Sequence, residues 1–394
     1  MEKNSKKKII IVNSNLNIGG VQKALINLLK CVSDKYDITL ALFNASGDLL
    51  KEIPDDVKIL PIKSDYRFLG LSKYDVENNF FLKLKRNLYA SITKMFGRDI
   101  AISLMGIRQK KLSRYDVAIS YIHNGSDKAF YGGCNDFVLR HIDANEKITF
   151  LHCDFELCGS DTRKNREKYK KFDVIAACSE GCRIKFVNKI PELECKTKVV
   201  YNCQDYDLIK KKADELEVDF AKNKINIVTI ARLGKEKGVS RAIEAIANSN
   251  LDKEKYHYYI IGDGIEKDII KEKIKKYDLN NNITLLGELI NPYPYLKAAD
   301  LLLIPSYSEA APMVIGEASY LGVPVLSTET SSTKEMIVDT ESGWVCENSI
   351  EGLGETLEIL VNNKNQLLDM KNSLEKIDYN NNFPIMQFKD LLEN

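Results

Sequence analysis

Two glutamates stand eight positions apart in the segment SYSEAAPMVIGEA, residues 306–318. Glu309 follows a short apolar run that predicts a buried parallel strand, and Glu317 lies inside the helix expected next. A carboxylate can accept hydrogen bonds from two neighbouring hydroxyls, so this pair has the chemistry to clamp two diol groups of one ligand. A surface turn followed by a solvated helical glutamate also fits these residues, and the segment alone leaves that alternative open.

Pro312 predicts the first position of this helix, because its ring fixes φ and its missing N–H is not needed there. The backbone N–H groups around the start of the helix would then point outward, where the helix dipole favours a phosphate. The candidate phosphate-binding residues at this position are Ala311, Pro312, Met313 and Val314.

A second candidate group lies in IARLGKEKGVSRAIEAI, residues 230–246. A strand ends near Arg232, and a loop brings Lys237 back before the next helix. A guanidinium and an ammonium both suit a diphosphate that gains negative charge as it leaves. Two exposed loop cations are the alternative for the same pattern.

Glycine turns follow several of the expected strands. Gly19 and Gly20 separate the first strand from the first helix, where a backbone without side chains can approach a ligand closely. Gly262, Gly264 and Gly287 follow later strands and could edge a nucleotide pocket, although tight structural turns explain them nearly as well.

His152 ends another expected strand, at the same ligand-facing edge. It can hydrogen-bond a substrate hydroxyl or phosphate, and a purely structural histidine is the alternative. The chain has nine cysteines and no Cys-x-x-Cys pair. The cluster His152, Cys153, Cys158, Cys178 and Cys182 matches no zinc motif in its spacing, so we expect reduced thiols and no bound metal.

The net charge of +1 hides an uneven distribution. Residues 1–205 hold 35 Lys and Arg against 25 Asp and Glu, and the remainder holds 22 against 31. Between residues 79 and 114 there are nine basic residues and one acid: Lys83, Lys85, Arg86, Lys94, Arg98, Arg108, Lys110, Lys111 and Arg114 against Asp99.

A helix in this basic stretch would have an apolar face of Phe81, Leu84, Leu88, Ile92 and Met95. The pattern favours a helix in an anionic membrane interface, over residues 80–114, and an ordinary helix packed on its own domain is the alternative. No apolar run reaches the length of a membrane span, and MEKNSKKK runs directly into a strand. We therefore expect a cytoplasmic protein, peripheral on the inner face of the membrane, with no nucleic-acid partner.

Strand-like and helical segments alternate from end to end, which predicts an α/β protein with parallel sheets covered on both faces. Two such series indicate two doubly wound, Rossmann-like domains. We place them at residues 1–205 and 206–379, on either side of a lysine-rich segment, and expect the tail 380–394 to return to the first domain.

The motifs NIGGVQKAL, FLHCDF, IARLGKEKG, IIGDG, YLKAADLLLIPSYSEAAPMVIGEA and GVPVLST occur in an order that resembles the retaining nucleotide-sugar glycosyltransferases of family 4. The resemblance implies a GT-B fold, two Rossmann-like domains facing each other across a cleft, with the donor held by the second domain and the acceptor by the first. It implies that Glu317 binds ribose and Glu309 the transferred sugar. Arg232 and Lys237 would bind the diphosphate, and Gly19, Gly20 and His152 would line the acceptor side.

The residues and order of these motifs most resemble those of bacterial enzymes that build capsular or other surface polysaccharides. These are metal-independent, use donors such as UDP-sugars and act on lipid-linked or glycan acceptors. One departure is Ala310, where family members usually carry glycine, and it bears on donor choice and rate. Two alternatives remain: a nucleotide-sugar epimerase of the same fold, and a noncatalytic glycan-binding partner of another transferase.

Overall fold

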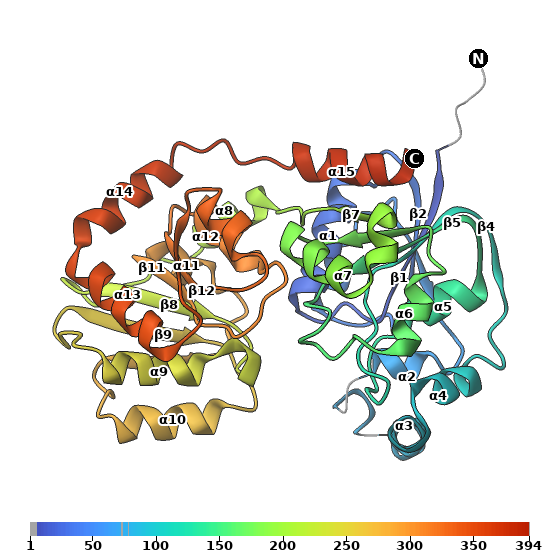
Figure 1. Ribbon diagram of the computed structural model, residues 1–394, viewed down its shortest axis with the longest axis horizontal. Coiled ribbons are helices and arrows are strands. Elements are labelled where there is room, and N and C mark those ends of the chain that lie inside the picture. Colours follow the sequence, from blue (N-terminus) through green and yellow to red (C-terminus); the bar gives the residue numbers. More distant parts are fainter. Residues whose placement is uncertain (1–5, 72–73, 78, 394) are drawn as a thin grey trace. The chain divides into compact units, whose positions relative to one another are not determined.

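The computed structural model describes residues 6–71, 74–77 and 79–393, and the chain forms two compact units (Figure 1). Unit 1 comprises the chain up to Cys203 together with Asn381 onward, and unit 2 comprises Gln204–Asn380. The division lies two residues before the boundary expected from the sequence. Each unit is an α/β layer structure, so the predicted fold class of two doubly wound domains is confirmed.

Unit 1 contains a parallel sheet of seven strands in the order β3-β2-β1-β4-β5-β6-β7. The strands are β1 (Lys8–Asn13), β2 (Asp37–Leu42), β3 (Lys58–Pro61), β4 (Leu112–Ser120), β5 (Ile142–Leu151), β6 (Val174–Ala177) and β7 (Thr197–Val199). Central strands such as β1 are apolar on both faces, because helices cover both sides of the sheet.

The helices of unit 1 lie between these strands in the chain, apart from α15 at its end. They are α1 (Gly20–Val32), α2 (Arg67–Gly70), α3 (Phe80–Phe96), α4 (Arg98–Met105), α5 (Cys134–His141), α6 (Arg163–Tyr169), α7 (Glu180–Lys189) and, from the end of the chain, α15 (Asn382–Glu393). Side-chain caps fix several helix starts; for example, Ser179 accepts from Cys182 N at 3.2 Å to begin α7.

The tail of the chain completes the core of unit 1. Phe388, Leu391 and Leu392 of α15 are buried in the same apolar cluster as residues of β1 and α1. The side chain of Gln387 accepts a hydrogen bond from Tyr201 N at 3.1 Å. The last helix is therefore part of unit 1, although 177 residues of unit 2 separate it from the rest of that unit in sequence.

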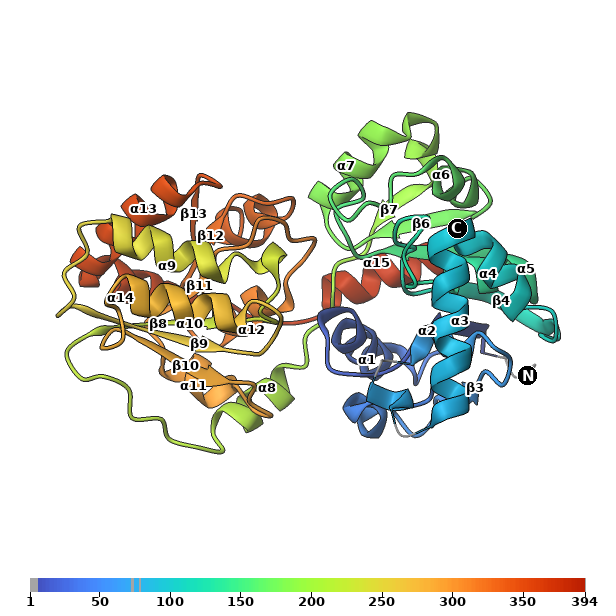
Figure 2. The same cartoon turned by 90° about the horizontal axis from the view of Figure 1, so that it is seen from below.

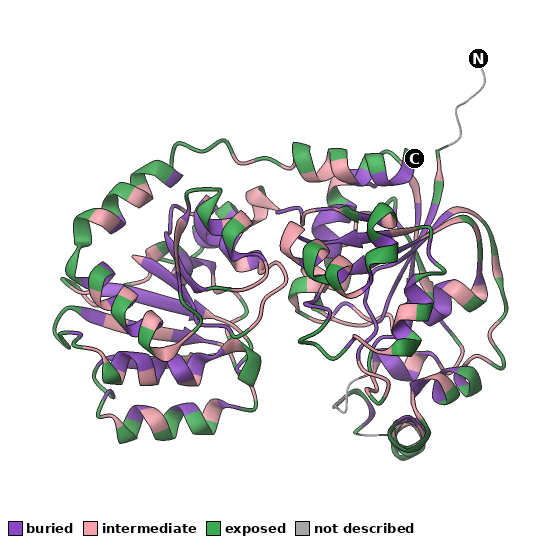
Figure 3. Cartoon of the chain, in the orientation of Figure 1, coloured by how far each residue is buried: buried purple, intermediate pink, exposed green. Residues whose placement is uncertain are grey.

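Unit 2 contains a parallel sheet of six strands in the order β10-β9-β8-β11-β12-β13. The strands are β8 (Ile225–Ile230), β9 (Tyr256–Ile261), β10 (Ile283–Gly287), β11 (Leu301–Ile304), β12 (Val325–Thr328) and β13 (Gly343–Cys346). The helices are α8 (Tyr206–Ala213), α9 (Val239–Asn248), α10 (Lys267–Lys276), α11 (Tyr293–Ala298), α12 (Met313–Tyr320), α13 (Ile350–Asn362) and α14 (Lys364–Leu374). Figure 3 shows the strands of both sheets mostly buried.

Strand order reverses once in each sheet: between β1 and β4 in unit 1, and between β8 and β11 in unit 2. At such a switch point the loops after the two strands leave in opposite directions, and ligands of open α/β sheets bind in the resulting crevice at the carboxyl ends of the strands. Each unit therefore has one favoured ligand-binding edge.

Apolar runs in the sequence predict strands that begin at residues 117 and 148, whereas β4 and β5 begin earlier, at Leu112 and Ile142. These two starts pair with each other, Leu112 with Ile142, and carry exposed polar residues such as Arg114 and Asn145. An extension without apolar alternation gives no strand signal in sequence. The short strands β3 and β13 were not predicted either.

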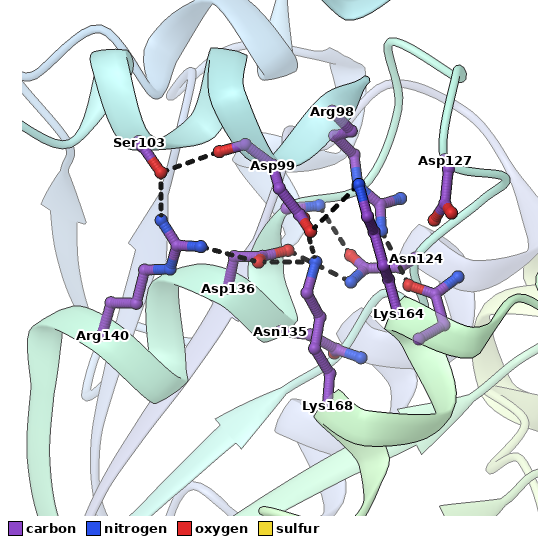
Figure 4. Close-up of polar contacts among 12 residues, drawn as sticks. Arg98, Asp99, Ser103, Asn124, Asp127, Asn135, Asp136, Arg140, Lys164 and Lys168 are labelled. Atoms are coloured by element: carbon purple, nitrogen blue, oxygen red, sulfur yellow. Dashed lines mark hydrogen bonds and ion pairs between the residues drawn. The ribbon is translucent and has the colours of Figure 1, made fainter. Parts of the chain in front are cut away.

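A buried polar network holds α4 against α5 and α6 (Figure 4). Lys168 pairs with Asp99 at 2.5 Å and with Asp136 at 2.8 Å. Burial raises the pKa of the Asp99 carboxyl, whereas the hydrogen bond and charge of Lys168 lower it. The lowering effects are together the larger, so the pKa of Asp99 lies below its ordinary value. Arg98, only 1% exposed, donates to Gly125 O at 3.0 Å and to Asn165 Oδ1 at 2.8 Å.

Arg98 of the predicted basic stretch does not contribute to the surface, because its guanidinium is hydrogen-bonded in the interior of unit 1. Arg86 is also partly buried and donates to Leu71 O at 3.0 Å, while Lys85 pairs with Asp65 at 2.7 Å. The exposed cations of the stretch are Lys83, Lys85, Lys94, Arg108, Lys110, Lys111 and Arg114.

Helix α3 packs on unit 1 through Tyr89 and Thr93, while most of its other residues are exposed (Figures 2 and 3). Phe81, Leu84, Leu88 and Met95 of the predicted apolar face are exposed, and Ile92 is half-buried against the core. Within the described ranges, no helix is both long and apolar enough to cross a membrane.

Candidate active site

Two loops at the switch point of unit 2 bring opposite charges together. The loop after β8 carries Lys237, the loop after β11 carries Glu309, and their Nζ and Oε1 atoms lie 2.7 Å apart. Ser306 donates its hydroxyl to the same oxygen at 2.7 Å. The two side chains are 25% and 10% exposed, so the pair is largely shielded but remains open to a ligand.

The loops are locked to each other next to this pair. Gly238 has φ +63°, and a Cβ built on it would lie 2.0 Å from Pro305 O, so only glycine permits this approach. Tyr307 N donates to Glu236 O at 2.9 Å across the same junction. Lys237 is thereby fixed beside Glu309 by backbone contacts on both sides.

Arg241 of α9 holds the loop after β11, which carries Glu309, through hydrogen bonds to its backbone. Its guanidinium, in a residue 2% exposed, donates to Pro305 O and Ser306 O, both at 2.8 Å, and to Thr328 Oγ1 at 3.1 Å. The guanidinium also lies 3.9 Å from the ring centroid of Tyr307. Burial lowers the pKa of Arg241, and the multiple donors in one plane explain why arginine occupies the position.

Glu317 lies in α12, immediately after the Glu309 loop, and is 5% exposed. Gln204 Nε2 donates to Met313 O at 3.0 Å and so anchors the start of this helix. The helix begins at Met313 with Pro312 as its N-cap, one residue later than expected. Pro312 has ψ 117°, which is extended, so it precedes the first turn instead of forming it.

Arg232 does not join the pair. It is exposed, and its guanidinium contacts Glu236 Oε1 at 2.8 Å, within the same loop. Of the two cations predicted to bind a diphosphate, the structure therefore brings Lys237 into contact with a predicted sugar-binding glutamate and leaves Arg232 at the rim of the loop.

The glycine turns of unit 2 have identifiable structural roles. Gly262 has φ +142°, and a Cβ there would lie 1.9 Å from Ala231 O; its N–H donates to Gly287 O at 2.7 Å. A Cβ on Gly264 would lie 2.5 Å from Leu233 O. These contacts pack the loop after β9 against the β8 loop that carries Lys237, and the end of β10 against the loop after β9.

The predicted acceptor-side residues lie at the corresponding edge of unit 1. Gly19 is extended, with φ −178°, and Gly20 opens α1; a Cβ on Gly20 would meet no described atom within 4 Å. Neither position requires glycine for backbone reasons.

His152 follows β5, with its ring centroid 4.8 Å from that of Tyr121. Burial, followed by the neighbouring His123, lowers the pKa of His152 to about 3, so the imidazole is neutral at pH 7.

Several residues that build these sites were not predicted from the sequence: Gly238, Arg241, Ser306, Gln204 and His123. Gly238 lies directly after Lys237 in a loop, and a glycine at such a position could have indicated a close backbone approach. No sequence feature indicates the role of Arg241, because a buried arginine on a helix has the same sequence pattern as an exposed one.

Comparison with proteins of known structure identifies the fold as GT-B. Anabaena HepE, solved in complex with UDP and glucose, matches with a TM-score of 0.68 and 18% identity, over 98% of this chain and all of that one. Rickettsia africae glycosyltransferase matches with a TM-score of 0.67 and 16% identity over 99% of both chains.

Sequence comparison supports a glycosyltransferase of this fold. Residues 210–377, nearly all of unit 2, match the family model described as "Glycosyl transferases group 1". A Klebsiella pneumoniae protein of the cps region is 29% identical, over 73% of this chain and 78% of its own. A Campylobacter jejuni diphospho-undecaprenol 4-α-N-acetylgalactosaminyltransferase is 25% identical, over 89% and 90%.

Proposed function

We propose that the protein is a retaining, metal-independent glycosyltransferase that moves a hexose or N-acetylhexosamine from a UDP-sugar to a lipid-linked or glycan acceptor during synthesis of a surface polysaccharide. The observation that carries this proposal is the Lys237–Glu309 pair at the switch point of unit 2, with Glu317 on the helix that follows. The UDP and glucose bound to HepE and the undecaprenol-linked substrates named for the Campylobacter enzymes support the choice of ligands.

The two groups of the pair suit different parts of a nucleotide sugar. Both contacts that the described chain makes to the Glu309 carboxylate fall on Oε1, which leaves Oε2 for sugar hydroxyls. An ammonium has three donors, and Lys237 uses one on Glu309, so two remain for the oxygens of a diphosphate. Glu309 thus orients Lys237 and binds the sugar at the same time.

Departure of the diphosphate is the step that these groups stabilise. Negative charge grows on the leaving oxygen, and Lys237, together with the N–H groups at the start of α12, lies where it can be neutralised. Arg232 joins them when it exchanges Glu236 for phosphate. Glu317 binds the ribose hydroxyls, and we assign Gly262, Gly264 and Gly287 to the wall of the nucleotide site.

On the acceptor side, we assign Gly19, Gly20 and His152. A neutral His152 can accept or donate a hydrogen bond to a hydroxyl without adding charge. The leaving phosphate itself can take the proton of the acceptor hydroxyl, so the reaction requires no separate general base.

The decisive experiment incubates the purified protein with radiolabelled nucleotide sugars and a membrane lipid extract. Transfer with the anomeric configuration kept, at a rate unchanged by EDTA, is the expected result. Isomerisation of the donor would instead establish the epimerase alternative, and no reaction with any donor would favour a noncatalytic partner. Lys237→Ala or Glu317→Ala proteins that transfer sugar at the wild-type rate would overturn the site assignment.

We also infer that α3 and α4 dock on an anionic membrane, where a lipid-linked acceptor is found. Six large apolar residues of α3 are exposed, and the surface continues through α4 to a residue just beyond its C-cap: Phe80, Phe81, Leu84, Leu88, Met95, Phe96, Ile100, Leu104 and Ile107. Exposed apolar patches of this extent mark interaction sites. The exposed cations Lys83, Lys94 and Arg108 on the same segments favour acidic headgroups as the partner.

This surface can be tested by sedimentation with vesicles. Wild-type protein should bind vesicles that contain phosphatidylglycerol more tightly than neutral ones, and Phe81→Ser with Leu84→Ser should weaken binding to both. Ile290→Ser, an equally simple change at a residue 96% exposed in unit 2, is the control. Equal binding by the double variant and the wild type would exclude α3 as the docking surface.

A further inference from the structure

Three potential metal ligands meet at the carboxyl edge of the sheet in unit 1. His123 follows β4, Cys153 follows β5, and Cys158 lies in the turn after Cys153. One ligand atom from each residue lies within 4.8 Å of the others, and the sulfurs of Cys153 and Cys158 are 3.0 Å apart. Spacing along the chain groups Cys153 and Cys158 with His152, Cys178 and Cys182, whereas the fold brings His123 to them.

The surroundings of this cluster favour a bound cation. His123 is 8% exposed, and its Nδ1 is buried without a hydrogen-bond partner in the described chain. Such an unsatisfied nitrogen in a protein interior is costly unless another group occupies the position. Cys153 is buried, while Cys158 is exposed, so the cluster is accessible from one side only.

Charge is also appropriate for a soft divalent ion. The Cys158 thiol donates toward Cys153, so the two sulfurs already face each other at 3.0 Å. Thiolate is the form of cysteine that binds metal. Cys153 and Cys158 would each release a proton to solvent when the ion binds, and the two thiolates would balance the charge of a dication.

We propose that His123, Cys153 and Cys158 bind one Zn²⁺ ion. Tetrahedral coordination with Zn–S bonds of about 2.3 Å places two sulfurs roughly 3.7 Å apart, which requires the present pair to open by less than about 1 Å. Cys158 lies in a turn, followed by Gly159 at φ +70°, where such a movement is easily accommodated. Three protein ligands leave the fourth position open toward the exposed side, for water or an oxygen of a bound molecule.

The site is distinct from the donor site, because all three ligands belong to unit 1. Ser160 Oγ lies 2.9 Å from Cys158 Sγ and donates to Asn124 O at 2.5 Å, so it links the outermost ligand to the loop after β4. Such outer contacts commonly orient metal ligands. A zinc ion here would join the loops after β4 and β5 next to the switch point of unit 1.

The test is a titration of the full-length protein, stripped of metal under reducing conditions, with Co²⁺ and then with Zn²⁺. We expect one Co²⁺ per chain with the absorption band of thiolate-to-cobalt charge transfer, and its displacement by Zn²⁺. Competition against a chromophoric chelator should show Zn²⁺ binding weakened roughly 10- to 100-fold, or more, in Cys158→Ser and in His123→Asn. Cys195→Ser, which removes an exposed thiol elsewhere in unit 1, should bind as the wild type does.

Circular dichroism of each variant shows whether it is folded. Cys158→Ser is the most informative variant, because substitution of an exposed residue is least disruptive to the fold. Absence of the charge-transfer band, or equal Zn²⁺ affinity of wild type and Cys158→Ser, would overturn the proposal. A protein that takes up no ion but forms a Cys153–Cys158 disulfide under mild oxidation would also overturn it, in favour of a redox pair.

Discussion

Units 1 and 2 have sheets of the same parallel strand order around the switch point, but their switch points carry different chemistry. After β8 and β11, unit 2 presents an ammonium and a carboxylate in contact. At the corresponding edge, after β1, β4 and β5, unit 1 presents small residues, a neutral His152 and two cysteines. The comparison shows that the scaffold determines where ligands bind, while the loop residues determine which ligand each edge can hold.

The difference has a physical basis in how each edge is built. Unit 2 supports its charged groups with buried donors such as Arg241 and with the close backbone approach at Gly238. Under the proposed function, these supports preorganise charge for a diphosphate, which is itself charged. Unit 1 places His152 among aromatic rings, where charge is disfavoured, and this suits the hydroxyls of an acceptor.

The largest expected effect is loss of transfer when the charged edge is neutralised. Lys237→Met should lower kcat/KM by roughly 100- to 1000-fold, because one preorganised donor to the developing charge is removed. Steady-state transfer kinetics measure this loss. Lys235→Met, two positions away and exposed, should retain near-wild-type activity. Equal losses in the two variants would mean that general loop charge, not the position of Lys237, is what matters.

Next in size is loss of stability on removing the support beneath the charged edge. Arg241→Gln should lower the free energy of unfolding by about 2–3 kcal/mol, since the carbonyls of Pro305 and Ser306 lose buried donors. Urea unfolding monitored by circular dichroism gives the value. Arg232→Gln, at an exposed site, should change it by less than about 0.5 kcal/mol. A stable Arg241→Gln protein would show that the loop is held by other contacts.

A smaller effect concerns pH and unit 1. The pKa of His152 is lower in the folded chain than its ordinary value, so the unfolded state binds more protons between the two values and stability falls as pH drops below about 6.5. For a fully buried imidazole, the free energy of unfolding would fall by about 2 kcal/mol between pH 7 and pH 5. Because His152 is partly exposed, we expect a fall of about 1 kcal/mol.

Urea midpoints across this range, in wild type and His152→Gln, isolate the contribution of that imidazole. The variant should lose less stability than the wild type on acidification. Parallel curves for the two proteins would contradict a neutral, shielded His152.

The smallest effect is expected at Gly20. Gly20→Ala should leave the free energy of unfolding unchanged or raise it by up to about 1 kcal/mol, because the residue begins α1 and a Cβ has room. If Gly20 lies against the acceptor, transfer should nevertheless decrease while UDP binding stays the same. Thermal melts and transfer assays on one preparation measure both. Unchanged transfer would remove Gly20 from the acceptor side.

Much of the fold was predictable because the spacing of apolar residues within each segment indicates a helix or a strand. Apolar spacing predicts a helix near Lys267–Lys276 and a strand at Ile225–Ile230, and both elements have these bounds in the structure. The polar starts of β4 and β5 could not be predicted, because they form through pairing with each other.

The candidate site was predictable only in part, for a similar reason. Glu309 and Lys237 stand out as charged residues after strands, and the sequence places them at one sheet edge. Their 2.7 Å contact depends on Gly238 and Pro305 meeting, which is a long-range backbone event. His123 joins Cys153 and Cys158 only because β4 and β5 are neighbours, so no spacing along the chain announces that cluster.

The position of α15 has a consequence for biosynthesis. Unit 2 is one continuous segment and can fold as soon as it leaves the ribosome, whereas the core of unit 1 lacks Phe388, Leu391 and Leu392 until the segment that follows unit 2 has been made. The unit begun first is therefore completed after the other. A chain truncated near residue 380 would carry a complete second unit and an incomplete first one, with an apolar surface available to chaperones.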